Sequence, residues 1–168
     1  TATIVNSINP VIIEIKNAVA ARQMLQKLLP IVSSAEDWHK NEGASVTLTF
    51  TYKGLEKIGV PQESLDTFPE SFKEGMAERS RFLYDIGVND PKNWEKVFRR
   101  SHIHIAAAII ANNEEAWKSK LEEFRSKLTN NSGVEVIMSH DFAVSEKVKN
   151  VFGFRDGISN PEIEGSGI

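Results

Sequence analysis

The stretch "HIHIAAAIIANNEEAWKSKLEEFRSKL" at residues 102–128 contains two hydrophobic patterns, one after the other. Residues 102–110 are short and apolar, which predicts a β-strand. Asn113 then precedes Glu114 and Glu115, a capping residue and an acidic first turn that predict the start of a helix. The apolar residues of that helix follow at steps of four, three and four: Trp117, Leu121, Phe124 and Leu128.

A second strand, "VEVIMSHDF" at residues 134–142, follows the polar loop "TNNSG", so this part of the chain predicts a β-α-β unit. An earlier unit of the same kind precedes it. That unit begins with the β-branched strand "VIIEIK" at 11–16, after a loose lead-in over residues 1–10. Asn17 can cap the helix that follows, and Pro30 lies at its expected end. The apolar stripe of this helix consists of Ala18, Ala21, Leu25 and Leu28.

The clearest strand of the chain is "SVTLTFTY" at residues 45–52, because apolar or aromatic residues alternate with threonines throughout. Its apolar face consists of Val46, Leu48, Phe50 and Tyr52. This strand completes the first β-α-β unit.

Two β-α-β units in series predict an α+β fold of the ferredoxin-like βαββαβ type, with an antiparallel sheet and both helices on one face. Right-handed crossovers place the first and third strands at the centre of the sheet. The other face then has no helices. We expect an insertion, a second domain or a second copy of the chain to cover it.

Residues 53–101, between the second and third strands, predict a helical insertion. Glycines and prolines divide it into short pieces, but its apolar residues are too numerous for a solvated loop. They are Leu55, Ile58, Leu65, Phe68, Phe72, Met76, Phe82 and Leu83.

The length of 168 residues predicts a single domain over residues 1–168. Twenty basic residues against 23 acidic ones give a net charge of -3, which argues against a nucleic-acid or anionic-membrane partner. The chain has no apolar run of membrane-spanning length and no visible secretion signal, so we expect a cytoplasmic location, although a start at Thr1 is compatible with processing. The absence of cysteine excludes disulfides, thiol catalysis and thiolate ligands.

Two histidine motifs contain residue types used in catalysis or metal binding. His102 and His104 are two residues apart on a predicted strand, so they share a face, but the spacing of the other residues suggests no third ligand. We therefore predict no metal site, while a metal- or small-ligand-binding domain built on this pair stays an alternative. "SHD" at 139–141 resembles a hydrolase triad only in composition, because neighbours on a strand point to opposite faces.

The segment "NVFGFRDGISNPEIEG" at residues 150–165 is a turn-rich loop with a single Arg-Asp pair. Two common turns explain its glycines and its proline. They do not explain why Phe152 and Phe154 alternate with Gly153 directly ahead of Asp156. Aromatic residues beside a carboxylate indicate a partly desolvated acid, which is an environment suited to proton transfer.

Three segments of the chain resemble the dye-decolorizing peroxidases (DyP-type), a family of haem peroxidases. "GFRDG" at residues 153–157 is similar to the family's GxxDG signature. "GLEKIGVP" at 54–61 resembles the family's stretch after its second strand, and "FPESFKEGMAERSRFLYDIGVNDPKNW" at 68–94 is similar to its segment ahead of the third strand. The resemblance spans about residues 10–165 and implies a dimeric α+β barrel, in which two ferredoxin-like halves pack sheet to sheet.

By this resemblance, Asp156 corresponds to the family's distal acid, which takes a proton from hydrogen peroxide and returns it to the leaving oxygen. The resemblance implies haem b as cofactor, with Gly153 and Gly157 allowing the backbone close to it and Phe152 and Phe154 keeping the site dry. Arg155 has no assigned role, because the family's distal arginine lies in its second half.

The family's proximal histidine also lies in the second half, and no histidine of this chain matches it. The prediction is therefore the N-terminal half of a DyP-type peroxidase, with residues 150–168 at the junction to a missing C-terminal half. We expect weak or no haem binding and poor turnover by this chain alone. The alternative is a non-enzymatic domain that forms a homodimer through its open sheet face.

Overall fold

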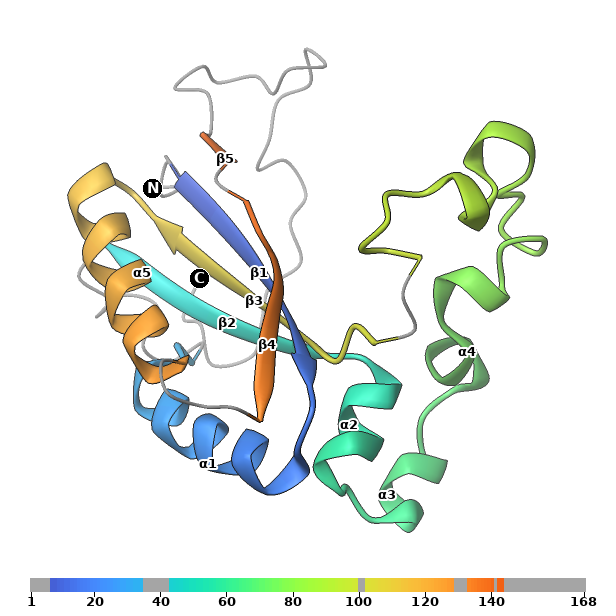
Figure 1. The fold of residues 1–168 in the computed structure, drawn as a ribbon, viewed down its shortest axis with the longest axis horizontal. Helices are drawn as coiled ribbons and strands as arrows, with labels where there is room; N and C mark the ends of the chain where they lie inside the picture. Colours follow the sequence, from blue (N-terminus) through green and yellow to red (C-terminus); the bar gives the residue numbers. More distant parts are fainter. Residues whose placement is uncertain (1–6, 35–42, 100–101, 129–132, 141, 144–168) are drawn as a thin grey trace.

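The computed structural model describes residues 7–34, 43–99, 102–128, 133–140 and 142–143 of the chain, which form one sheet, two long helices and a helical insertion (Figure 1). The strands are β1 (Ser7–Ile15), β2 (Ala44–Phe50), β3 (Ile105–Ala111), β4 (Val134–Ser139) and β5 (Phe142–Ala143). The α-helices are α1 (Ala18–Leu28), α2 (Tyr52–Ile58), α3 (Gln62–Asp66), α4 (Glu70–Glu78) and α5 (Glu114–Leu128). Short 3-10 helices are η1 (Leu29–Ile31), η2 (Gly87–Asn89) and η3 (Pro91–Asn93).

The sheet has the strand order β2-β3-β1-β4, all neighbours are antiparallel, and β5 also pairs with β1. The first and third strands, β1 and β3, therefore lie at the centre. This arrangement confirms the ferredoxin-like prediction, including the central pair that right-handed crossovers require.

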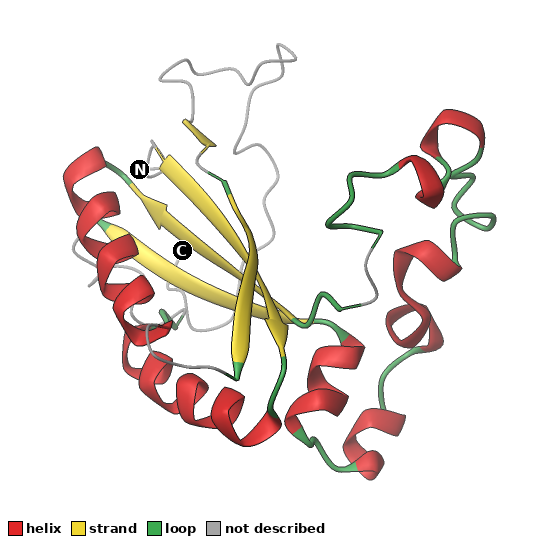
Figure 2. Cartoon of the chain, viewed as in Figure 1, coloured by secondary structure: helices red, strands yellow, loops and turns green. Residues whose placement is uncertain are grey.

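The hydrophobic core lies between the sheet and the helices α1 and α5, which both cover the same face (Figure 2). Alternate residues of β3 point into it, and the largest buried side chain is Phe124 of α5. Both helices begin as predicted, since Asn17 and Asn113 each accept a hydrogen bond from a backbone N–H three residues later. The rest of the core is Val11, Ile13, Ile15, Ala21, Met24, Leu28, Val46, Ile105, Ala107, Ile109 and Leu121.

The lead-in predicted over residues 1–10 is wrong for its last four residues, because β1 already begins at Ser7. Pro10 therefore lies inside a central strand, where its missing N–H would normally leave a ladder acceptor unpaired. His140 N–H donates to the Pro10 carbonyl at 3.2 Å, and the Asn9 side-chain amide donates to the His140 carbonyl at 3.0 Å. The buried Asn9 side chain thus replaces the hydrogen bond that Pro10 cannot make.

The second strand ends at Phe50, two residues before the predicted end, because Thr51 caps α2. The Thr51 hydroxyl accepts the Gly54 N–H at 3.0 Å, so Tyr52 belongs to the helix and not to the strand. The third strand likewise begins at Ile105 and not at residue 102.

The insertion is helical, as predicted, and it extends away from the sheet on the side opposite α5 (Figure 1). Only Gly54 and Leu65 are buried within its helices α2, α3 and α4. Seven large apolar side chains of the insertion are exposed: Met76, Phe82, Leu83, Tyr84, Ile86, Val88 and Phe98.

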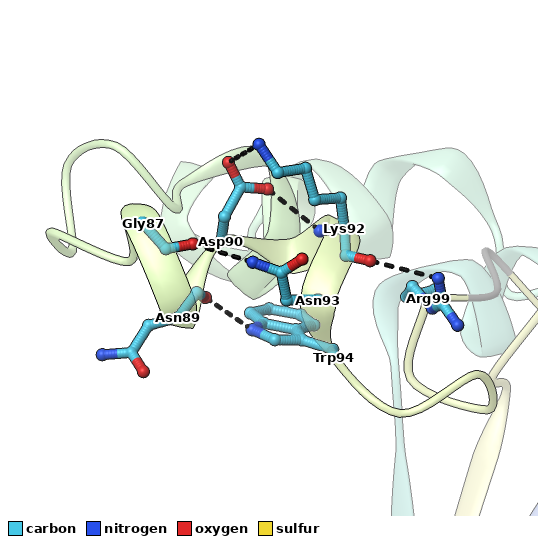
Figure 3. A network of polar contacts seen from close by, with 7 residues as sticks. All are labelled: Gly87, Asn89, Asp90, Lys92, Asn93, Trp94 and Arg99. Atoms are coloured by element: carbon cyan, nitrogen blue, oxygen red, sulfur yellow. Dashed lines mark hydrogen bonds and ion pairs between the residues drawn. The ribbon is translucent and has the colours of Figure 1, made fainter.

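Polar contacts within the chain hold the last part of the insertion in shape (Figure 3). The Trp94 indole N–H donates to the Asn89 carbonyl at 2.8 Å, and the Asn93 amide donates to the Gly87 carbonyl at 2.8 Å. The Asp90 carboxylate accepts the Lys92 N–H and pairs with the Lys92 ammonium. These contacts are local in sequence, so this loop needs no hydrophobic core to keep its conformation.

No helix in the described part of the chain has both the length and the apolar character needed to cross a bilayer.

Candidate functional site

The predicted catalytic acid, Asp156, lies outside the described residues, and so do the predicted cofactor-binding residues Phe152, Gly153, Phe154 and Gly157. The last described strands along the chain are β4 and β5, and β5 pairs with β1 at Ser7 and Ile8. What the described residues do define is the sheet face opposite the helices and a polar cluster where β1 ends.

The sheet face opposite α1 and α5, called the open face below, consists of alternate residues of neighbouring strands. The strand register places Ile12 beside Ala106 and Met138, and Pro10 beside Ala108. Most of these side chains are half-buried, small or apolar, and no described helix packs on them in the way α5 packs on the other face. The open face comprises Pro10, Ile12, Glu14, Ser45, Thr47, Thr49, Ala106, Ala108, Ile110 and Met138. Charge lies only at one end of this face, at Glu14, while its middle is small and apolar, which is suited to packing against another sheet.

Charged groups gather where β1 ends. The Lys16 ammonium lies 2.7 Å from the carboxylate of Glu14 and 3.0 Å from that of Glu135 on β4. Its hydrogen bond holds the pKa of the mostly buried Glu14 carboxylate below its usual range, and the hydrogen bond from Glu14 raises the pKa of Lys16. The pair therefore stays ionised at neutral pH, which is what a carboxylate at the edge of a sheet core requires.

His104 lies beside this cluster and is only 6% exposed. Its Nδ1 accepts the N–H of Ile15 at 2.8 Å, which requires a neutral ring with its proton on Nε2. Burial lowers the pKa of the His104 imidazole, and the nearby Lys57 and His102 act in the same direction against the attraction of Glu14. His104 is thus a structural acceptor for β1 at neutral pH.

The metal-binding alternative has little support from this geometry. The rings of His102 and His104 are 6.5 Å apart between centroids, and Nδ1 of His104 is already engaged. Within the described ranges, no group of three or more His, Cys, Asp or Glu side chains could hold a metal ion.

The described residues also do not fit the haem that the resemblance implies. A haem ligand needs a free imidazole nitrogen in an enclosed apolar site. His104 has its Nδ1 engaged, while His102 and His140 are exposed near strand ends. We accordingly derive no step through haem from this part of the chain.

The "SHD" residues and the tryptophans that the structure describes make contacts that stabilise the fold. Ser139 Oγ donates to Asn9 at 3.3 Å, and the His140 backbone continues the ladder, while Asp141 lies outside the described residues. The Trp94 indole N–H donates to the Asn89 carbonyl and so anchors its loop, and Trp38 lies outside the described residues. Trp117 packs against the core, but its buried indole N–H has no hydrogen-bond partner within the described structure.

Sequence reasoning missed the link between Glu14, Lys16, Glu135 and His104. One signal was present, because Glu14 interrupts an otherwise apolar strand of valine and isoleucine. A carboxylate in such a strand predicts a partner, but which cation supplies it depends on the pairing of β1 with β4.

The order of elements, the central β1–β3 pair and the two helices on one face define the fold class as one α+β unit of the ferredoxin-like kind. The sequence of residues 6–144 matches the family described as the DyP dimeric alpha+beta barrel domain. The chain belongs to this family, which is the family of the DyP peroxidases' N-terminal domain. No curated protein matches the chain.

Solved DyP structures share the fold. An ancestral D-type dye decolorizing peroxidase superimposes with a TM-score of 0.78 at 22% identity, over 95% of this chain and 37% of that one. A structure described as DyP gives a TM-score of 0.76 at 24% identity, over 100% of this chain and 37% of that one. The enzyme of Auricularia auricula-judae gives 0.74 at 17% identity, over 95% and 36%. The chain thus spans little more than a third of the length of these structures.

Proposed function

We propose that this chain supplies the N-terminal half of a haem peroxidase of the dye-decolorizing type, which oxidises dyes or phenolic compounds with hydrogen peroxide. The observation that carries the proposal is the family match over residues 6–144, combined with a span of 37% of the matched structures. Within this proposal the open face packs against a second α+β unit. Its small and apolar side chains support that role, because burial of an apolar sheet face is favourable.

In the proposed enzyme, Asp156 is the acid that accepts a proton from hydrogen peroxide and returns it to the leaving oxygen. Haem b would supply the oxidation chemistry, and the second unit would supply its axial ligand. A positioned acid of this kind contributes about 10²–10⁴-fold to a rate. The carboxylate is one residue before Gly157 and follows two phenylalanines, so the sequence supports a partly dry site.

The test has two arms. In the first, the 168-residue chain is titrated with haem and assayed with hydrogen peroxide and a dye. We expect no tight stoichiometric Soret band and poor turnover; tight binding with turnover would contradict the idea that a second unit is needed.

In the second arm, the source DNA is read beyond the codon of Ile168, and any continuing frame is expressed. We expect a second α+β unit that includes a histidine, haem binding by the longer chain, and a loss of about 10²–10⁴-fold in turnover for Asp156→Asn. Glu162→Gln is the matched control, since it removes a neighbouring carboxylate outside the signature. A longer chain that binds haem but keeps its turnover in Asp156→Asn would exclude the role of Asp156.

A second candidate function is a non-enzymatic domain that forms a homodimer through the open face. The same largely apolar sheet surface supports it, because a second copy would bury that surface as well as a second half would. Light scattering of the purified chain distinguishes the two. A monomer at all concentrations counts against self-association, whereas Ala108→Glu, at the centre of the open face, should dissociate a dimer that uses it.

A further inference from the structure

Both ends of the helical insertion meet at one point of the sheet. At the start of the insertion, Thr51 N–H donates to the His104 carbonyl at 3.1 Å, and the Thr51 hydroxyl donates to the Ile103 carbonyl at 2.7 Å. The same hydroxyl caps α2 by accepting the Gly54 N–H. Residues 102–104, called the exit segment below, are where the chain returns from the insertion to the sheet. Thr51 therefore links the start of the insertion to its end by hydrogen bonds.

The exit is fastened in turn to the end of β1 by His104. Its backbone N–H donates to the Ile13 carbonyl at 3.1 Å, and its ring Nδ1 accepts the Ile15 N–H at 2.8 Å. The contact is also sterically close, because a Cβ at Gly54 would lie 2.0 Å from the His104 carbonyl oxygen. The first turn of α2 and β1 thus converge on His104, α2 through its backbone carbonyl and β1 through its backbone N–H and its imidazole.

We propose that His104 is a pH-sensitive latch, which holds the insertion to the end of β1 while its ring is neutral and releases it when the ring takes up a proton. The physical reason is the direction of one hydrogen bond. A protonated imidazole carries hydrogens on both nitrogens, so Nδ1 can no longer accept the Ile15 N–H. That N–H would then face a donor inside a buried contact, which costs free energy on both sides.

The charged groups around the ring set the direction of the response. Glu14 on β1 favours protonation, whereas Lys16 on β1, Lys57 on α2 and His102 on the exit segment oppose it. Lys16 is shared between Glu14 and Glu135, so the carboxylate is already paired and cannot fully stabilise a second cation. Burial adds to the opposition, since the ring is 6% exposed.

The sign of the pH effect follows from the lowered pKa of His104. In the opened state the ring titrates near its usual value of 6.5, while in the closed state it stays neutral to lower pH. The latch is therefore fully closed above about pH 6.5 and weakens as pH falls below it. Opening coupled to the uptake of one proton rises by at most about tenfold per pH unit in that window.

The experiment is amide hydrogen exchange of the 168-residue chain by NMR between pH 7.5 and 5.0, corrected for intrinsic exchange rates. We expect the opening of the Ile15, Thr51 and Gly54 amides to increase by up to about tenfold per pH unit below pH 6.5. Amides of the core helix α5, such as that of Phe124, should not follow this pH dependence.

The variant His104→Asn offers an amide oxygen at a similar position to Nδ1 and does not titrate, so its three amides should show no such pH dependence. His102→Asn is the matched control, and it should keep the pH dependence of the wild type. Equal opening at all pH values in the wild type overturns the proposal, as does an unchanged pH dependence in His104→Asn. If His104→Asn does not fold, the NMR chemical-shift titration of the wild type decides. The pH midpoint of the Ile15 amide must coincide with that of the His104 ring, and a mismatch overturns the latch.

Discussion

The sheet layer and the helical insertion are stabilised in different ways. In the sheet layer, α1 and α5 bury a continuous set of large apolar side chains against β1 and β3, including Phe124, Ile13 and Ile109. In the insertion, the described helices bury only Gly54 and Leu65, and the loop after α4 depends on local polar contacts. Hydrophobic burial therefore stabilises the first region, whereas hydrogen bonds within short segments shape the second.

This difference shows where burial within the chain contributes stability. The sheet layer buries its own core, while the insertion, with Phe82 and Val88 exposed, gains little from its apolar residues until something covers them.

The joint between the two regions includes Thr51, Gly54 and His104. It also includes α1, whose Arg22 guanidinium donates to the Ile58 carbonyl of α2 at 2.6 Å, and Ile58 packs against the core.

The strongest test of the comparison is the truncation of one apolar side chain in each region. Phe124→Ala should lower the free energy of unfolding by about 3–5 kcal/mol, because it leaves a cavity in the core. Val88→Ala, at a side chain that is 87% exposed, should change it by less than about 0.5 kcal/mol. Urea denaturation of both variants measures this, and a comparable loss from Val88→Ala would break the comparison.

The joint can be tested by adding a single methyl group. Gly54→Ala should lower the free energy of unfolding by about 1–3 kcal/mol, because its Cβ would overlap a backbone oxygen that cannot move aside without shifting the exit segment. Lys53→Ala, one residue earlier on the exposed face of α2, is the control and should stay within about 0.5 kcal/mol. An unchanged free energy of unfolding in Gly54→Ala would show that the joint is looser than the distances indicate.

The polar loop of the insertion should respond locally. Trp94→Phe removes the indole N–H that donates to the Asn89 carbonyl. The free energy of local opening should fall by about 1 kcal/mol, which corresponds to about fivefold faster amide exchange in residues 87–94. The urea midpoint of the sheet layer should not change. A lower midpoint for the whole chain would instead mean that the loop and the core unfold together.

The smallest effect concerns the Glu14–Lys16 pair. Because the pKa of Glu14 is lowered from its usual 4.5, its ionised form contributes stability above that pH and loses it as pH falls further. Lys16→Met should therefore make the stability less dependent on pH between 5 and 3, as followed by thermal unfolding. Lys27→Met on α1 is the control, and a pH dependence that is the same in all three proteins would exclude a contribution from the pair.

Much of the fold could be predicted from residue patterns that act locally. Asn17 and Asn113 cap their helices because a side-chain oxygen three residues before an N–H is sufficient for capping. The apolar stripe of α5 predicted correctly which face of the helix is buried, since Leu121 and Phe124 lie in the core. The strand order followed from the handedness of the crossovers.

The errors lie where two signals compete for the same residues. Thr51 continues the alternation of β2, yet it caps α2, and the helix cap determines the end of the strand. Pro10 suggested a lead-in, because the sequence does not reveal that Asn9 can supply the missing hydrogen bond to His140. Residues 102–104 looked like a strand, but His104 uses its ring to hold Ile15. The predicted site at Asp156 stays a prediction, since it lies outside the described residues.

The sequence by itself determined the fold class, the two capped helices, the helical insertion and the resemblance to DyP-type peroxidases. Each of these depends on periodicity, caps or motifs that operate over a few neighbouring residues. Only the tertiary structure decided that Glu14, Lys16 and Glu135 form one ionic cluster and that His104 joins the insertion to β1. The reason is distance along the chain: His104 and Ile15 are 89 residues apart, and only the folded sheet brings an imidazole to that N–H.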